Sequence, residues 1–108
     1  MKKTAQAPAH LSQAAAAWWD RIVRDWDLDD SGILILTTAA EAFDRMREAQ
    51  SLVKEHGILI DDRFDQKKVN PAVLVERDSR SAMLQAIKQL NLDLEPLRDG
   101  PGRPPGGR

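Results

Sequence analysis

Apolar residues recur at helical spacing in the first third of the chain. Ser12 can cap a helix, and the apolar positions around it follow one another at steps of one, three or four residues. These positions are Leu11, Ala15, Trp18, Trp19, Ile22, Val23 and Trp26. The pattern predicts one face of a helix of about four turns, which ends at the polar run 27–30.

A second, longer stripe predicts a helix that begins at Asp30 or Ser31 and runs to His56, with Gly57 just past its end. Its apolar positions are Ile33, Leu36, Ala40, Phe43, Ala49 and Val53, and charged residues fill the other face. Because only a short loop separates the first two helices, we expect them to pack as an antiparallel pair.

The spacing changes after Gly57. Residues 58–60 are β-formers, residues 61–66 form a polar, aspartate-rich turn, and residues 67–69 can form a second short strand. A small β-hairpin is therefore predicted for this segment.

A third helix is predicted to start at Asn70-Pro71, because a capping residue precedes a proline at the first helical position. It runs to about Leu90, with an apolar stripe made of Val75, Ala82, Met83, Ala86, Ile87 and Leu90. The predicted fold class is mainly α, with an antiparallel helix hairpin, a small β-hairpin and a third helix.

The two ends of the 108-residue chain differ from its middle. Residues 1–10 have no apolar period, so we expect a flexible arm and no secretory signal. Residues 11–97 form the single predicted domain, and the Pro-, Gly- and Arg-containing residues 98–108 are expected to be a disordered tail. A helical domain this small buries a limited part of its surface, and self-association is a common remedy.

Charge is unevenly distributed, although the net charge is only −1. By residue count the net charge is +2 over residues 1–26, −6 over residues 27–65 and +3 over residues 66–108. The basic ends could contact nucleic acid, whereas an ordinary solvated surface explains the same charges without any partner. The candidate phosphate contacts are Lys2, Lys3, Arg21, Arg24, Lys67, Lys68 and, within a Gly-Arg-Pro segment that could enter a minor groove, Arg103.

Catalytic and metal sites find little support in the sequence. There is no cysteine, no phosphate-binding loop and no apolar run long enough to span a bilayer. The stretch 27–32 begins like a calcium loop, but Thr38 stands where that loop needs a glutamate. The aspartates of 61–65 are favoured in a turn for their own backbone bonding. We expect no enzymatic activity, no metal and no cofactor.

The order of these features resembles the family of phage terminase small subunits. The resemblance covers about residues 10–98 and rests on a tryptophan-bearing helix, an acidic turn before a long helix, a glycine followed by a hairpin, and Asn70-Pro71-Ala72 before the next helix. It implies a ring-shaped homo-oligomer in the cytoplasm of the infected bacterial host. Such a ring recognises double-stranded viral DNA and recruits the large subunit, which carries the ATPase motor and the nuclease for genome packaging.

Two other functions remain open at this point. A DNA-binding regulator with a helix-turn-helix would need two short helices and an exposed recognition helix. A protein-interaction module with no role in DNA binding would use the same amphipathic helices, and it would show no salt-dependent binding to DNA.

Overall fold

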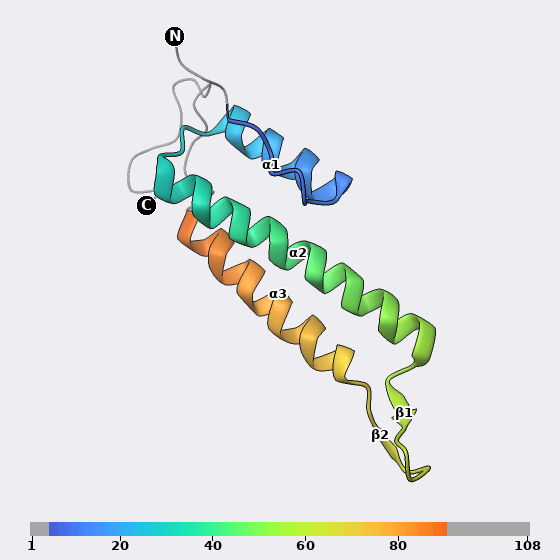
Figure 1. The fold of residues 1–108 in the computed structure, drawn as a ribbon. Coiled ribbons are helices and arrows are strands. Elements are labelled where there is room, and N and C mark those ends of the chain that lie inside the picture. Colours follow the sequence, from blue (N-terminus) through green and yellow to red (C-terminus); the bar gives the residue numbers. More distant parts are fainter. Residues whose placement is uncertain (1–4, 91–108) are drawn as a thin grey trace.

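Three helices and one two-stranded sheet make up residues 5–90, the part of the chain that the computed structural model describes (Figure 1). In chain order the elements are α1 (Gln13–Asp25), α2 (Asp30–His56), β1 (Leu59–Asp61), β2 (Lys67–Val69) and α3 (Pro71–Leu90). The mainly helical fold class with a small β-hairpin is thereby confirmed. The predicted tail and the residues from 91 onward lie outside the described residues, as do the first four of the predicted arm.

Local chemistry sets the ends of α1 and α2. The Ser12 hydroxyl accepts the Ala15 N–H at 3.1 Å, as predicted for a cap. The second helix starts at Asp30 as predicted, but the capping side chain is that of Asp29, which accepts the Gly32 N–H at 2.8 Å. At the other end of α2, Gly57 has a φ of 91°, a conformation that favours glycine.

The long α2 helix lies between the other two helices and runs antiparallel to both (Figure 1). The predicted antiparallel pairing of α1 with α2 is confirmed. The most extensive contact, however, is between α2 and α3, which the β-hairpin connects. Periodicity along the chain did not reveal this second pairing.

The core consists of two different seams. Between α1 and α2 lies a cluster of Leu11, Ala15, Trp19, Ile22, Leu36 and Ala40. The other buried residues of α2 and α3 are mostly small: Ala39, Ala42, Met46, Ala49, Ala72, Ser79 and Ala86. Because small side chains let helix axes approach closely, this second seam forms without a broad apolar stripe. The stripe predicted for α3 was therefore partly wrong, since Val75 and Ala82 are exposed.

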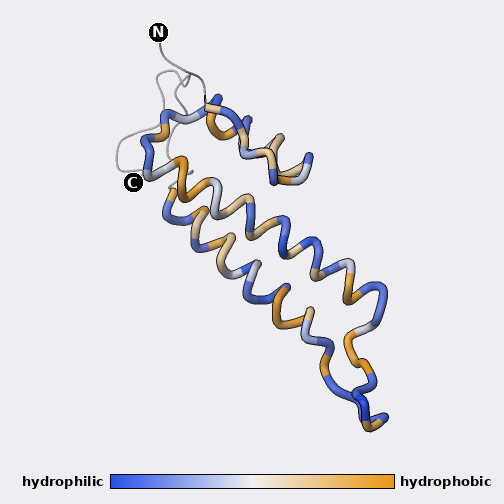
Figure 2. Tube along the Cα trace, viewed as in Figure 1, coloured by the Kyte–Doolittle hydropathy of each residue, from blue (hydrophilic) through white to orange (hydrophobic). Residues whose placement is uncertain are grey.

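The protomer is thin, so it leaves large apolar side chains in water. Among residues 5–90, nine such side chains are exposed: Leu34, Leu52, Ile58, Leu59, Phe64, Val69, Leu74, Val75 and Leu84. Figure 2 shows hydrophobic positions along both long helices and again in the hairpin beyond them. No described helix is both long enough and apolar enough to cross a bilayer.

Candidate functional site

The arginines predicted as phosphate contacts on α1 face away from the core. Trp19 and Ile22 of this helix are buried, whereas Arg21 and Arg24 are exposed on the opposite side. Arg24 lies 4.0 Å from the Asp25 carboxylate, an exposed ion pair that leaves the guanidinium accessible. Both guanidinium groups are therefore accessible from outside the helices.

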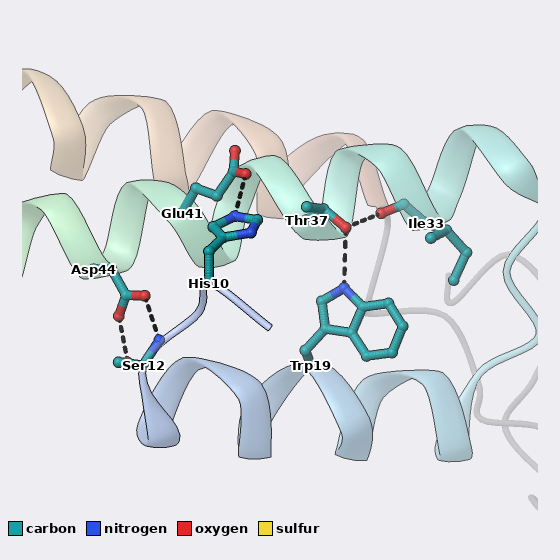
Figure 3. A network of polar contacts seen from close by, with 7 residues as sticks. All are labelled: His10, Ser12, Trp19, Ile33, Thr37, Glu41 and Asp44. Atoms are coloured by element: carbon teal, nitrogen blue, oxygen red, sulfur yellow. Dashed lines mark hydrogen bonds and ion pairs between the residues drawn. The ribbon is translucent and has the colours of Figure 1, made fainter. Parts of the chain in front are cut away.

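Polar contacts with α2 fix the orientation of α1 (Figure 3). The Ser12 N–H and hydroxyl both donate to the Asp44 carboxylate, at 2.8 and 2.5 Å. The buried Trp19 donates its indole N–H to the Thr37 hydroxyl oxygen at 3.1 Å. With two such points of attachment, α1 cannot easily rotate its outer face inward.

The segment before α1 also lies against α2. His10 Nε2 is 2.7 Å from a carboxylate oxygen of Glu41, Leu11 is buried, and Ala7 packs against the core cluster. Glu41 is one helical turn from Arg45 but pairs with His10 instead. This leaves Arg45 exposed and without a carboxylate partner among the described residues, so it is a candidate phosphate contact that the sequence did not single out.

The second predicted basic group lies on the hairpin. Lys67 pairs with Asp61 across the strands at 2.9 Å, and the neighbouring Lys68 is exposed with no ion pair in the described part of the chain. Arg63, in the turn, places its guanidinium carbon 5.3 Å from the centre of the Phe64 ring. The tip of the hairpin thus combines cations with an exposed aromatic ring.

One protomer does not bring the two basic groups together. Arg21 and Arg24 lie on α1, near the first half of α2, and the lysines lie beyond the opposite end of α2 (Figure 1). The 27 residues of α2 span about 40 Å at 1.5 Å per residue. The other predicted contacts, Lys2, Lys3 and Arg103, lie outside the described residues. A single continuous phosphate-binding strip is therefore not formed by the described residues of one chain.

The acidic residues of the turn have structural partners. The Asp62 carboxylate accepts the backbone N–H groups of Gln66 and Phe64, at 3.0 and 2.8 Å. These bonds, that of Gln66 foremost, lower the pKa of Asp62 below its ordinary value of 3.8. Within residues 5–90, no three histidine, aspartate or glutamate side chains gather where they could hold a metal ion.

Asn70 joins the end of α2, the hairpin and the start of α3. Its amide donates to the Gly57 carbonyl at 2.9 Å, and its side-chain oxygen accepts the Ala72 N–H at 3.0 Å. Its backbone N–H donates to Ile58 O and its carbonyl accepts from Val73 N–H. Only 7% of Asn70 is exposed, and all four of its polar groups are bonded. The Asn-Pro-Ala motif thus has a structural role.

The helices do not form a helix-turn-helix. The second helix of that motif is short and lies free to enter a DNA groove. Here α2 has 27 residues and packs against both α1 and α3. This arrangement gives the rival hypothesis of a helix-turn-helix regulator no support.

One family comparison extends over most of the chain. The model of the family described as "Phage terminase, small subunit" matches residues 15–95, which include nearly all of α1 and every later element. Searches among curated proteins and among solved structures found no match. The matched segment contains the cap of α2, the hairpin and the Asn70 junction described above.

Proposed function

Because the chain belongs to the family of phage terminase small subunits, we propose that it recognises viral DNA and recruits and regulates the large subunit during genome packaging. In this role it carries out no catalysis, since the ATPase and nuclease chemistry belongs to the large subunit. The family match over residues 15–95 is the observation that carries the proposal.

The protein acts as a homo-oligomeric ring in this proposal. Its support is the set of large apolar side chains that a lone protomer exposes on α2, the hairpin and α3, among them Leu34, Phe64 and Leu84 at 68%, 68% and 54%. A contact with neighbouring copies would remove such side chains from water. A closed ring repeats one contact around an axis.

Ring formation also accounts for DNA binding by a chain of net charge −1. A ring repeats Arg21 and Arg24 in one belt and Lys67 and Lys68 in another. Each contact with a phosphate is weak, but repetition on one assembly raises the total affinity through effective concentration. The contacts proposed here position a duplex and do not by themselves read its bases.

Two double variants with the same change in charge test the proposed contacts on α1. Arg21→Gln/Arg24→Gln removes the outer arginines, and Lys54→Gln/Lys88→Gln removes two exposed lysines that the proposal does not use. Affinity for packaging-site DNA is measured by fluorescence anisotropy between about 50 and 200 mM salt, a range over which phosphate contacts weaken strongly. The arginine variant should bind more weakly, with a shallower dependence on salt, and the lysine variant should bind almost as the unmodified chain does.

If both variants lost the same affinity for DNA, the proposed location of the contact on α1 would be refuted. The loss would then be explained by the change in net charge alone. Binding of the unmodified chain that is absent, or that does not change with salt, would favour the protein-interaction module instead. Recruitment is tested separately, by co-sedimentation with the purified large subunit, and no complex in the presence of packaging-site DNA would contradict that part of the proposal.

A further inference from the structure

The tip of the hairpin presents an aromatic side chain in a fixed position. Phe64 is 68% exposed, which is unusual for a ring of this size in water. Its turn is nevertheless ordered, because the Asp62 carboxylate accepts two backbone N–H groups and Asp65 adopts a left-handed φ of 61°. An exposed ring on an ordered turn loses little conformational entropy on binding, as do the aromatic anchors of protein interfaces.

An apolar cavity lies where the three helices meet. It has a volume of about 340 Å³ and is lined only by apolar side chains: Ala14, Ala15, Trp18, Phe43, Met46, Met83 and Ile87. A closed apolar cavity of about 150 Å³ is enough for benzene. The cavity at the helix junction can therefore accept a phenyl ring from outside.

The ring of Phe64 cannot enter the cavity of its own chain. From Phe43 to His56, α2 extends for about 20 Å at 1.5 Å per residue. The three residues of β1 add about 10 Å at 3.3 Å per residue, and Figure 1 shows that the hairpin continues away from the helices. Only another molecule can bring such a ring to the cavity.

We propose that the hairpin tip of one copy docks into the three-helix cavity of a second copy, with Phe64 inserted between Trp18 and Met83. The hollow beside the cavity shares Ala14 and Phe43 with it and contains Glu48 together with Arg45 and Arg47. The tip likewise carries both signs of charge, with Asp62 and Asp65 next to Arg63. The contact therefore rests on the fit of the exposed ring to the apolar cavity.

This contact joins two different surfaces of the same chain, so it can repeat from copy to copy. Interfaces of this head-to-tail kind generate rings when the rotation between copies closes. The inference rests on the self-association proposed above, and it names the side chain and the cavity that would make the contact.

Site-directed cross-linking tests the contact cleanly, because the natural chain has no cysteine. A Gln66→Cys variant carries a thiol beside the tip and keeps Phe64, and an Ala14→Cys variant carries one at the mouth of the cavity. The two variants are mixed and treated with a short bismaleimide, and the cross-linked mixed dimer is identified by its mass. A Ser81→Cys variant, on an exposed position of α3 that lines neither hollow, replaces Ala14→Cys as the matched control.

The mixed Gln66→Cys/Ala14→Cys product should form readily, and the product with Ser81→Cys should not. Adding Phe64→Ala to the Gln66→Cys chain should suppress the product and weaken self-association about 30-fold, as for an interface anchor. Unchanged circular dichroism would show that the variant folds.

Three results would overturn the docking contact: no mixed product, a product that Phe64→Ala leaves unchanged, or cross-linking mainly between two Gln66→Cys chains. Light scattering on the unmodified chain separates this failure from that of the proposed function. An oligomer without the mixed product would refute the docking contact alone, whereas a monomer at micromolar concentration would refute the proposed ring as well.

Discussion

Trp19 is the side chain on which the attachment of α1 depends, and its removal gives the sharpest test of the packing. It is 1% exposed and lies in the cluster formed with Ile22, Leu36 and Ala40. Replacing a buried tryptophan by alanine costs about 3–5 kcal/mol, through lost burial and the cavity left behind. A small domain has a total stability of about 5–15 kcal/mol. Trp19→Ala should therefore remove a large part of the free energy of unfolding.

A second substitution isolates the hydrogen bond from the packing. Thr37→Val removes the oxygen that accepts the indole N–H at 3.1 Å and leaves that N–H buried. The loss should be about 1–3 kcal/mol when Trp19 is present. In the Trp19→Ala background the same substitution should cost much less, because there is no longer an N–H to satisfy. The difference between the two values is the coupling energy of the pair.

Urea denaturation followed by far-ultraviolet circular dichroism measures all four chains of this cycle, since tryptophan fluorescence changes with the substitution itself. The protein concentration is held constant because self-association also affects stability. If Trp19→Ala costs less than about 1 kcal/mol, the indole is not the anchor that its burial indicates. If Thr37→Val costs the same in both backgrounds, the hydrogen bond contributes nothing.

Three further predictions concern the junctions around the hairpin. Asn70→Ala should lower the thermal midpoint more than Asn70→Ser, because a serine hydroxyl can keep the cap of α3, worth about 0.5–2 kcal/mol, while both variants lose the bond to the Gly57 carbonyl; equal midpoints would contradict this division of roles. Gly57→Ala should destabilise the chain by about 1–3 kcal/mol in urea denaturation, because alanine is strained at its backbone angles, and a neutral result would mean that the end of α2 readjusts freely. Because the pKa of Asp62 is lowered by folding from an ordinary value of 3.8, its contribution to the turn is present above that value and lost as the pH falls through its folded pKa. The amide resonances of Phe64 and Gln66 should follow that loss in an NMR titration, and unchanged resonances, or the same titration in an Asp62→Asn variant, would refute it.

The elements that sequence predicted well are those fixed by local chemistry. Gly57 marks the C-terminal end of α2, because a backbone conformation with positive φ depends on one residue. Asn70-Pro71 marks the start of α3, because a helix cap depends on one or two residues. The interpretation of the turn's aspartates as backbone partners holds for Asp62, whereas the Asp61 carboxylate pairs with Lys67. Trp19 was predicted on the apolar face of the first helix, and this side chain lies in the core.

The pairing of α2 with α3 was harder to predict. Its seam uses Ala39, Ala42 and Ser79, which add little to a hydrophobic periodicity but permit close packing. His10 and Glu41 pair although they are 31 positions apart in the sequence, and no local pattern predicts this contact. For the candidate site, the sequence identified basic residues that are exposed. It did not show that the arginines of α1 and the lysines of the hairpin lie toward opposite ends of α2. Such separation depends on tertiary topology.

The hydrogen bonds around Asn70 form a stiff hinge between the hairpin and the helices. Its four hydrogen bonds connect the residues between α2 and β1 to the first turn of α3, so the hairpin changes its angle to the helices only if these bonds deform. The three residues of β2 extend about 10 Å at 3.3 Å per residue, so a tilt of about 10° at Asn70 would move the far end of the strand by roughly 2 Å. A small change in angle caused by a substitution near Asn70 would therefore become a larger displacement at the hairpin tip. Evolution could in this way adjust the curvature of an assembly without altering the surfaces through which its copies touch.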